Sequence, residues 1–416
     1  MNRSASRWLG AKIDAPVKHH STAARESRMR NAIASKTGDA SSPPHLLGGR
    51  TPAAFMSRYW QKRPLLVRGA YPTFDTCLTR DRLIELACRD DVDARLVVRE
   101  RARYTLTQGP FARRHFRDLP ATDWTLLVQG VNRVDAASDR LLRSFSFVPY
   151  ARLDDVMVSY AAPGGGVGAH FDSYDVFLLQ GSGRRRWRYG KTSDRSLVAN
   201  AELKILRRFS PRHDVVLRAG DMLYLPPAIA HDGRAVDACI TYSIGFRAAT
   251  YAEMSEAFLD FLRDHLHLPD GRYADPDARP TRSPARIDTA MRRRVKMTLA
   301  SLRWSDTDVG RFLGCHLSEP KPIVRFRAPT APLGKAGFIA KIAAGGLTLD
   351  RATQLLYDSV SFYMNGEAVT FRGAGNNLLR RLANRRALSS RECGNISGPL
   401  GEMLYGWYRY GFIQPG

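Results

Sequence analysis

Hydrophobic and polar positions change their period twice along the chain, which divides it into three ordered stretches. Between residues 46 and 250, short runs rich in β-branched and aromatic residues alternate with turns that contain Gly and Pro. A short helix is expected at Thr51-Pro52, followed by the buried strand PLLVRGAYP. The further strand-like runs are DDVMVSYAAPGGG, YDVFLLQGSG, RRRWRYG, DVVLRAGDMLYLPP and CITYSIGFRA. Strands of this length with turns between them predict an antiparallel barrel or sandwich.

Residues 251–318 follow a helical period instead. In YAEMSEAFLDFLRDHLHLP the apolar side chains recur every three or four residues, which predicts an amphipathic helix that ends before Pro269. These apolar positions are Met254, Phe258, Phe261, Leu262 and Leu266. The segment IDTAMRRRVKMTLASLRWSDTDVGRFLGCHL continues the same period. Two or three helices cannot hide this much apolar surface from one another, so we expect a partner, either the barrel or a second copy of the chain.

Residues 319–416 mix both patterns. We expect a strand at IVRFRA, a helix at LTLDRATQLLYDSV, a hairpin SFYMNGEAVTF that turns at Asn365-Gly366, and a final amphipathic segment. A helix followed by a hairpin is compatible with a winged-helix module. Its arginines could contact nucleic acid or form a solvated basic face; they are Arg372, Arg380, Arg381, Arg385 and Arg386.

Composition adds a probable class of partner and a compartment. The 416-residue chain has a formal net charge of +24, and a surface this basic attracts polyanions such as RNA or a ribonucleoprotein, unless the whole proteome is basic. The five cysteines never form a C-x-x-C pair, which favours a reducing compartment, the cytoplasm. No apolar run is long enough to span a bilayer. Residues 1–45 are basic and rich in Ser and Ala, which predicts a disordered tail, with a transit peptide as the alternative.

A candidate metal site begins in the segment GAHFDSYDVF. His170 and Asp172 lie two residues apart, and on a strand such residues point to the same face, where both can bind one ion. His231, in GDMLYLPPAIAH, is the expected third ligand. Two imidazoles and one carboxylate leave positions of an octahedral ion open, as in non-haem Fe(II) oxygenases, whereas imidazole alone would also suit zinc or copper. Asp175 is the rival carboxylate, but it has the opposite strand parity to His170.

An Fe(II) site of this kind needs O2 and an electron-donating co-substrate, commonly 2-oxoglutarate. In GSGRRRWRYG, Arg185 shares a strand face with Trp187 and Tyr189, and a bulky aromatic face normally points inward. Arg185 is therefore the candidate to bind the co-substrate carboxylate. The arginines left for solvent or a polyanionic partner are Arg184, Arg186 and Arg188. The alternative is a fully exposed basic hairpin. The glycines of PGGGVGAH are expected to let the backbone pass close to a metal or ligand.

With these residues assembled, the chain resembles the JmjC-type ribosomal oxygenases, bacterial enzymes that hydroxylate an arginine of large-subunit ribosomal protein L sixteen. The resemblance covers residues 46–416 and is carried by YWQKRPLLVRGAYP, PGGGVGAHFDSYDVFLLQGSGRRRWR, GDMLYLPPAIAHDG, YSIGFRA and, more weakly, FYMNGEAV. It implies an α+β chain. A JmjC double-stranded β-helix, which is a cupin-like jelly roll, would span residues 46–250, a helical dimerisation module residues 251–318, and a winged-helix-like domain residues 319–416.

The resemblance also implies roles for particular residues. Fe(II) would be held by His170, Asp172 and His231, and 2-oxoglutarate by Arg185.

In family members an acid, a methionine and a tyrosine flank the target arginine. The matching positions here are Asp155, Met157 and Tyr174, with Ser243 as a further contact. Asp155 and Met157 share strand parity, and a carboxylate beside an apolar wall suits a guanidinium on an alkyl stem. For Asp155, a surface acid at a strand end is the alternative.

Two positions depart from the family pattern around the co-substrate. Ala161 stands where the family often has a serine that helps to hold the co-substrate carboxylate, and Thr241 stands where it has an asparagine. Thr241 can still donate a hydrogen bond, whereas Ala161 cannot. Either Ser159, which shares parity with Ala161, or Tyr160 takes over, or the co-substrate is held more weakly.

The sequence thus predicts a 2-oxoglutarate- and Fe(II)-dependent hydroxylase that adds a 3-hydroxyl group to an arginine of protein L sixteen. The first alternative is the same chemistry on a histidine or another residue of a translation protein, although an acid at Asp155 favours a cationic target. The second is a cupin-like module without catalysis that serves as a ribosome or RNA adaptor. A zinc hydrolase is a distant third.

Overall fold

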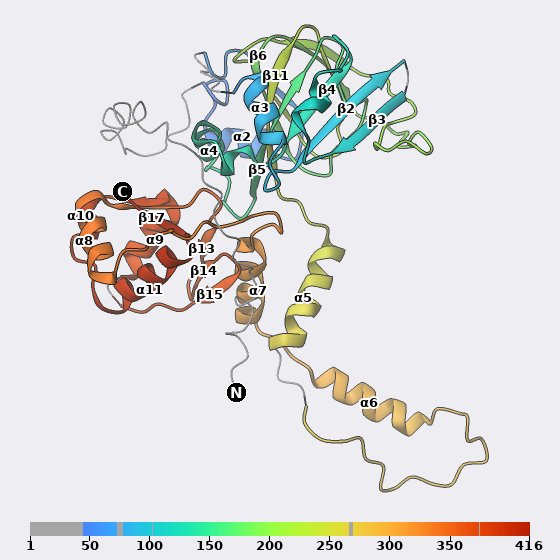
Figure 1. The fold of residues 1–416 in the computed structure, drawn as a ribbon. Helices are drawn as coiled ribbons and strands as arrows, with labels where there is room; N and C mark the ends of the chain where they lie inside the picture. The colour runs from blue at the N-terminus through green and yellow to red at the C-terminus, as the bar shows by residue number, and fades with distance from the viewer. Residues whose placement is uncertain (1–44, 73–77, 102, 266–268, 374) are drawn as a thin grey trace. The chain divides into compact units, whose positions relative to one another are not determined.

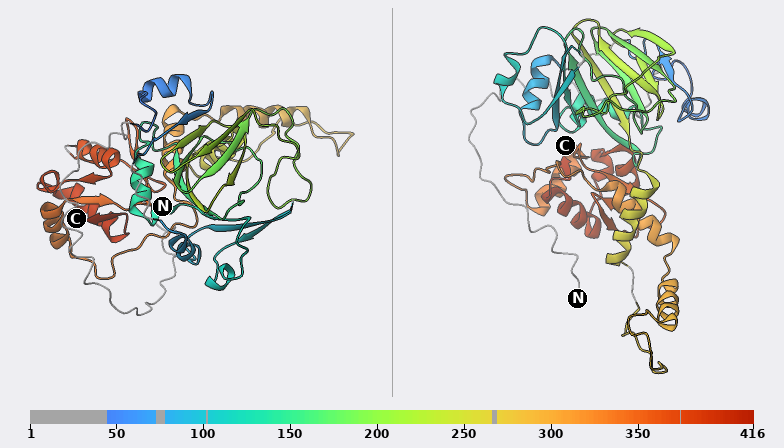
Figure 2. Two further views of the ribbon diagram at one scale, coloured as in Figure 1. Left: turned by 90° about the horizontal axis from the view of Figure 1, so that it is seen from above. Right: turned by 90° about the vertical axis from the view of Figure 1, so that its right-hand side faces the viewer.

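The strands of the first half of the chain form two antiparallel sheets. The protein is represented by a computed structural model that describes residues 45–72, 78–101, 103–265, 269–373 and 375–416. Within these residues, an eight-stranded sheet has the order β1-β9-β6-β11-β5-β4-β2-β3, and a three-stranded sheet has the order β10-β7-β8 (Figures 1 and 2). The strands are β1 (Leu65–Val67), β2 (Ala94–Glu100), β3 (Arg103–Gln108), β4 (Trp124–Val128), β5 (Leu153–Ala161), β6 (Val176–Ser182), β7 (Arg185–Gly190), β8 (His213–Leu217), β9 (Met222–Leu225), β10 (Ala230–Ala235) and β11 (Cys239–Phe246).

The order of the strands confirms the predicted jelly roll. Strand β11 lies between β5 and β6, and β9 lies between β1 and β6, so neighbours in the sheet are often distant in sequence. Every predicted run of the region 151–247 contains a strand. The expected short helix is α2 (Pro52–Arg58), whose first turn is capped by the Thr51 side chain accepting a hydrogen bond from Ala54 N at 3.2 Å. Short elements connect the strands: α3 (Arg80–Ala87), η1 (Arg113–Phe116), η2 (Val131–Arg133) and α4 (Ala136–Arg143).

An aromatic core joins the first helix to the large sheet. Phe55 of α2 is fully buried and packs against Phe177 of β6 and Tyr224 of β9, with ring centroids 5.5 and 5.0 Å apart. Phe145, which follows α4, lies 4.7 Å from Phe177. Because large aromatic rings bury much apolar area and interlock at their edges, this cluster fixes the sheet face that lies behind the pocket described below.

The glycine loop 163–168 passes close to other backbone segments, as expected. A Cβ atom on Gly165 would lie 2.2 Å from the carbonyl oxygen of Trp124, and one on Gly166 would lie 2.5 Å from the carbonyl oxygen of Gly233. Gly164 N donates to Ala235 O at 2.9 Å. The loop therefore packs backbone against backbone along β10, where no side chain larger than hydrogen fits.

The second stretch confirms the predicted helical module. Its helices are α5 (Tyr251–His265), α6 (Thr289–Ser301) and α7 (Asp306–Ser318). The rings of Phe258 on α5 and Phe312 on α7 lie 5.2 Å apart, and Leu262 is buried. In α6 no residue is buried, and Met297 is 66% exposed. Leu266, also expected on the apolar face, lies outside the described residues.

The C-terminal region combines α8 (Lys335–Gly345), α9 (Asn376–Arg385), α10 (Ser390–Cys393) and α11 (Gly398–Arg409) with two small three-stranded sheets, ordered β16-β12-β17 and β13-β14-β15. The predicted hairpin is confirmed: β14 (Phe362–Met364) pairs with β15 (Glu367–Val369), and Asn365 and Gly366 adopt positive φ angles of 51° and 94°. The remaining strands are β12 (Leu347–Leu349), β13 (Leu355–Tyr357), β16 (Ala387–Leu388) and β17 (Ile413–Pro415).

Two predictions for this region are wrong. LTLDRATQLLYDSV is not a helix but β12, a turn and β13. Leu347 and Leu349 are buried with Thr348 exposed between them, and Asp350 accepts a hydrogen bond from Ala352 N at 2.9 Å in the turn. IVRFRA forms no strand. No described strand pairs with it, and Phe326 packs on Phe412 with a centroid distance of 4.7 Å.

No helix among the described residues combines the length and the hydropathy that crossing a bilayer would require.

We expect Gly165→Ala to lower the free energy of unfolding by about 1–3 kcal/mol, because the new methyl group would overlap two backbone carbonyls, those of Trp124 and Ala162. Gly406→Ala in α11 is the matched control, since no atom lies within 4 Å of its added Cβ, and alanine in a helix interior is favourable by about 0.5–1 kcal/mol over glycine. Urea denaturation of the three proteins measures both changes. Equal stability of the Gly165 variant and the parent would contradict this account of the loop.

Candidate active site

A backbone bridge brings the two candidate histidines together. His170 N donates to His231 O at 2.9 Å, and His231 N donates to His170 O at 2.7 Å. This pairing of the glycine loop with β10 places the two imidazole rings side by side, with centroids 4.3 Å apart. Asp172 follows in a segment without regular secondary structure, and its carbonyl oxygen accepts a hydrogen bond from Ala228 N at 2.9 Å. Residues from two distant parts of the sequence are thereby fixed around one point.

The three side chains present ligand atoms to a common centre. His170 Nε2 lies 3.8 Å from Asp172 Oδ1, His231 Nε2 lies 3.6 Å from Asp172 Oδ2, and the three donor atoms lie within 4.8 Å of one another. Each imidazole Nδ1 lies 2.9 Å from a backbone carbonyl, that of Gly168 or of Ile229. A carbonyl oxygen accepts a hydrogen bond from a protonated Nδ1, which leaves the lone pair on each Nε2 facing the centre, as a metal ligand requires.

The donor set fits a divalent transition metal. Burial, and then the neighbouring His170, lower the pKa of His231 to about 4, so its imidazole is neutral at neutral pH. Two imidazoles and one carboxylate that leave coordination positions open are typical of Fe(II) oxygenase sites, whereas structural zinc sites have four protein ligands and no open position. Within the part of the chain that the structure describes, this is the only group of three histidine, cysteine or acidic side chains arranged to hold an ion.

One step of the sequence argument is wrong, although the triad itself assembles. His170 and Asp172 were expected on one strand, but the strand pairing stops at the His170 bridge and β6 begins only at Val176. Asp175, the rival carboxylate, is fully buried away from the triad. It accepts hydrogen bonds from Tyr224 Oη at 2.6 Å and from Gln61 Nε2 at 3.0 Å. Because the hydrogen bonds of this buried carboxylate are satisfied within the core, Asp175 has a structural function.

Arg185 lies inside the pocket on β7. Arg185 is 4% exposed. Its guanidinium donates hydrogen bonds to Gly233 O at 3.1 Å and to the hydroxyls of Ser159 and Thr241 at 3.3 and 3.4 Å. Its Nε has no hydrogen-bond partner, and burial lowers the pKa of the guanidinium. Among the described residues, no carboxylate forms an ion pair with it. A buried cation with neutral partners and a spare donor fits a bound carboxylate such as that of 2-oxoglutarate.

The alternatives around Ala161 separate clearly in the structure. Ser159 lines the same cavity as Arg185 and Thr241, whereas the Tyr160 ring packs against Trp124 at 5.1 Å, on the other face of β5. Ala161 is buried beside Ala235 and Cys239. Gln180 Oε1 accepts a hydrogen bond from Thr241 Oγ1 at 3.1 Å, which holds the hydroxyl in place. Ser159 is thus the hydroxyl available beside the arginine.

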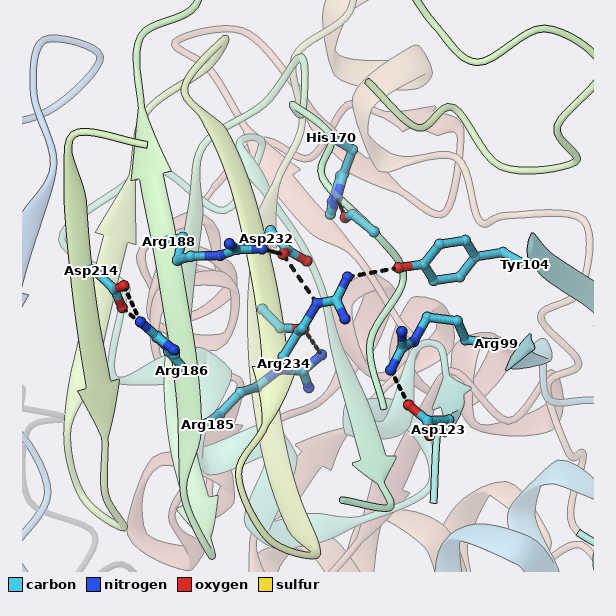
Figure 3. A network of polar contacts seen from close by, with 12 residues as sticks. Arg99, Tyr104, Asp123, His170, Arg185, Arg186, Arg188, Asp214, Asp232 and Arg234 are labelled. Atoms are coloured by element: carbon cyan, nitrogen blue, oxygen red, sulfur yellow. Dashed lines mark hydrogen bonds and ion pairs between the residues drawn. The ribbon is translucent and has the colours of Figure 1, made fainter. Parts of the chain in front are cut away.

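The three outward arginines are not a free basic patch. Arg186 forms a two-bond ion pair with Asp214 at 2.7 and 2.5 Å, and Arg188 pairs with the buried Asp232, to which Arg234 also donates (Figure 3). Arg184 forms an ion pair with Asp237, with a distance of 2.7 Å between Nε and Oδ2. Strand parity separated Arg185 from these residues correctly: the side chains of Arg184, Arg186 and Arg188 are 52, 57 and 37% exposed, so they face solvent as expected, and each is paired there with a carboxylate. A contact of these arginines with a polyanion stays a prediction.

A cavity of about 480 Å³ joins the triad, Arg185 and the candidate substrate residues. The sequence-derived residues that line it are Asp155, Met157, Ser159, Tyr174, Arg185, Thr241 and Ser243, together with His170, Asp172 and His231. Tyr174 is 40% exposed, so it lies at the mouth, whereas Asp155 is 3% exposed. The cavity thus leads from a half-exposed aromatic ring to a buried carboxylate beside the triad.

Gln129 and Arg95 line the cavity and contact the Asp155 side of it, and neither was singled out from the sequence. Gln129 Nε2 donates to both oxygens of Asp155 at 2.9 Å, and its Oε1 accepts from Arg95 at 3.2 Å. The signal was present, since Gln129 directly follows the fully buried strand β4, where a polar side chain needs a partner. Burial, and then the like charge of Asp154, raise the pKa of Asp155; Lys321, whose Nζ lies 3.6 Å away, and Gln129 oppose the shift.

The fold and the site define a class: a jelly-roll protein with a two-histidine, one-carboxylate metal site. The JmjC domain model matches residues 140–254, and the ROXA-like winged helix model matches residues 301–414. The X-ray structure of Escherichia coli YcfD superposes with a TM-score of 0.79 at 30% identity, covering 88% of this chain and 98% of that one. The chain therefore belongs to the JmjC-domain ribosomal oxygenases, with the predicted winged-helix domain at its C-terminus.

Named relatives and a ligand-bound structure show which proteins the chain is similar to. The E. coli K12 protein named ribosomal protein uL16 3-hydroxylase is 38% identical over 234 residues, which are 56% of this chain and 62% of that protein. A Haemophilus influenzae protein named probable ribosomal oxygenase is 40% identical over 201 residues, 47% of this chain and 50% of its own. These matches span only part of both relatives. A YcfD structure in complex with cobalt and 2-oxoglutarate has a TM-score of 0.74 at 30% identity, covering 86% of this chain and 96% of that one.

We expect Asp172→Ala and His231→Ala each to weaken Co(II) binding by more than about 100-fold, because each removes a direct ligand, and loss of an outer partner alone typically costs about 10–100-fold. Titration of the full chain with Co(II), followed by its visible absorption, measures this. His213→Ala is the matched control: this exposed histidine stacks on Tyr189 at 4.8 Å and lies outside the triad. Co(II) binding at full affinity by the Asp172 variant would contradict the assignment of the triad as the metal ligands.

Proposed function

We propose that this chain is a 2-oxoglutarate- and Fe(II)-dependent protein hydroxylase that adds a hydroxyl group to the β-carbon of an arginine of ribosomal protein uL16 (L sixteen). The observation that carries the proposal is one cavity containing the His170–Asp172–His231 triad, the buried Arg185 and the buried Asp155. A metal site alone would suit many reactions. The combination of a buried cation, suited to a carboxylate, and a buried acid, suited to a guanidinium, in the same cavity as the triad favours this reaction.

In this proposal His170, Asp172 and His231 hold Fe(II), and Arg185, Ser159 and Thr241 hold 2-oxoglutarate. Bound together, the metal and co-substrate supply the oxidising chemistry: O2 and 2-oxoglutarate are consumed, succinate and CO2 are released, and one oxygen atom enters the target C–H bond. The protein contributes placement. Arg185 orients the co-substrate through a planar fork of donors, and the cavity walls hold the target carbon and exclude bulk water.

The substrate pocket in this proposal is formed by Asp155, Met157, Tyr174 and Ser243. Asp155 carries the recognition: this buried carboxylate accepts hydrogen bonds from the neutral Gln129, and Lys321, whose Nζ lies 3.6 Å away, donates its hydrogen bond to Asp154, so Asp155 can still pair with a guanidinium. Met157 lines the cavity beside it and offers a soft apolar wall to the alkyl part of an arginine. A neutral histidine would bring no positive charge to this carboxylate, whereas an arginine would, which favours arginine over the alternative target.

We further propose the domain division 46–250, 251–318 and 319–416, a homodimer formed through residues 251–318, a contact with RNA through the basic surface, and a cytoplasmic location beside the ribosomes. Support for the dimer comes from α6: Met297 and Leu299 are 66% and 61% exposed, and a helix without buried residues is not stable on its own in water. Sedimentation velocity of the full chain measures the dimer directly.

Incubation of the full chain with uL16, Fe(II), 2-oxoglutarate and O2 is expected to add the mass of one oxygen atom to a single arginine, located by tandem mass spectrometry. Asp172→Ala should give no product, and His213→Ala should give as much as the parent. Amino-acid analysis against synthetic 3-hydroxyarginine separates the β-carbon from other positions. Product on a histidine, or full turnover by the Asp172 variant, would contradict the proposal.

The raised pKa of Asp155 predicts a pH dependence of substrate binding. Only the ionised carboxylate pairs with a guanidinium, so KM for an arginine peptide should rise as the pH falls, beginning above the usual range of an aspartate. Asp155→Asn should have a high KM that does not vary over this range. Asp154→Asn is the control that removes the neighbouring like charge, and it should move the rise to lower pH. Steady-state kinetics across pH test this, and identical profiles for all three proteins would refute it.

A further inference from the structure

The loop between β7 and β8, residues 191–212, forms one side of the cavity mouth. We refer to it as the β7–β8 loop. Within it Leu197 pairs with Leu206, and Arg207 N donates to Ser196 O at 2.9 Å, so the segment folds into a small hairpin. Leu206 N donates to Ala169 O at 2.7 Å, directly before His170. Leu203 and Lys204 line the cavity. The loop is therefore attached to the segment that carries the metal ligands.

The β7–β8 loop carries exposed positive charge without partners. Its basic residues are Lys191, Arg195, Lys204, Arg207, Arg208 and Arg212, and all six are exposed. Within the described residues, none forms an ion pair with a carboxylate, although Arg195 lies over the Phe171 ring at 5.2 Å. This differs from the neighbouring outward arginines of β7, each of which has an aspartate partner.

The two acids of the loop are used locally. Glu202 accepts a hydrogen bond from Leu106 N on the edge strand β3 at 2.5 Å, and Asp194 accepts one from Ser196 N at 2.9 Å. The pKa of Asp194 is lowered first by Ser196 and then by the charges of Arg207 and Arg208. Both acids therefore accept hydrogen bonds from neutral backbone donors. The net charge of the loop stays positive, and this charge lies at the mouth of the cavity that contains the buried Asp155.

A positive mouth opposes the approach of a free basic protein. Ribosomal proteins bind RNA and carry basic surfaces themselves, so their like charge would be repelled within about 8–10 Å at physiological salt. The repulsion becomes attraction if a polyanion accompanies the target. RNA phosphates match the loop, because arginines bind phosphate oxygens through paired donors and the side chains stand free in solvent.

We propose that the β7–β8 loop binds the phosphate backbone of RNA that accompanies the target protein, so that bound RNA strengthens the docking of the target while the cavity acts on the arginine itself. This inference rests on the proposed function for the identity of the target. Binding is expected to depend on the sugar–phosphate backbone and not on base sequence, since the exposed groups that carry it are the guanidinium and ammonium groups of the loop, which bind phosphate oxygens.

Fluorescence anisotropy of a fluorescein-labelled RNA oligonucleotide of mixed sequence, titrated with the full chain at several KCl concentrations, tests this. Arg207→Ala with Arg208→Ala should weaken binding several-fold and make the plot of log K against log salt shallower by roughly 1.4, the loss of two contacts to a single strand. Arg184→Ala with Arg186→Ala is the matched control, because it removes the same formal charge from ion-paired positions. It should leave the slope near that of the parent.

Hydroxylation of a short arginine peptide, measured with the same two double variants, separates this proposal from the function itself. Arg207 and Arg208 do not line the cavity, so peptide turnover should be retained while RNA affinity falls. An unchanged salt slope in the Arg207/Arg208 variant, or an equal loss in both double variants, overturns the RNA site. Loss of peptide turnover with RNA affinity intact overturns it too. If the parent hydroxylates no peptide, the proposed function fails, and the RNA comparison can still be read.

Discussion

The two backbone hydrogen bonds between His170 and His231 are the contact on which the site depends. They join the end of the glycine loop to β10, sixty-one residues further along the chain (231 − 170), and set the imidazoles 4.3 Å apart. Side-chain attraction could not do this, because two histidines without a metal gain little from each other. The two backbone hydrogen bonds place the ligand side chains before any metal binds. The loop needs its glycines because Gly165 and Gly166 lie against backbone carbonyls, where a side chain would not fit.

The alternation of side chains along β5 and β11 determines which residues face the cavity beside this contact. Residues of β5 at alternate positions, Asp155, Met157 and Ser159, face the cavity, and β11 places Ser243 opposite Met157 and Thr241 opposite Ser159. A single register therefore sets both subsites: a slip of one residue would turn all of these side chains to the opposite face. Asp155, proposed to bind the substrate, and Ser159, proposed to bind the co-substrate, lie on the same strand at a fixed spacing, so in the proposed function this strand would fix the target carbon relative to the co-substrate.

Sequence reasoning recovered what depends on local periodicity and missed what depends on partners. Alternation predicted the inward Arg185 and the β5 residues, and three-to-four spacing predicted α5 and α7. The same alternation was mistaken for a helix at Leu347–Tyr357, where apolar residues fit either period over so short a span. Gln129 and the aspartates that neutralise Arg184, Arg186 and Arg188 lie on other elements, so only the folded structure shows that these arginines are paired and that Asp155 has a neutral donor.

The site combines charges of opposite sign that act over different ranges. Asp155 lies in a low-dielectric interior, so it acts strongly but only on a group that has entered the cavity. The exposed arginines of the β7–β8 loop act through water and are screened beyond about 8–10 Å. An acidic mouth would draw in any basic chain and offer its arginines to the same carboxylate. In the proposed recognition of RNA, a basic mouth in front of a buried acid would favour a target whose bound RNA offsets the repulsion, and the buried acid would then select a cationic side chain of that target.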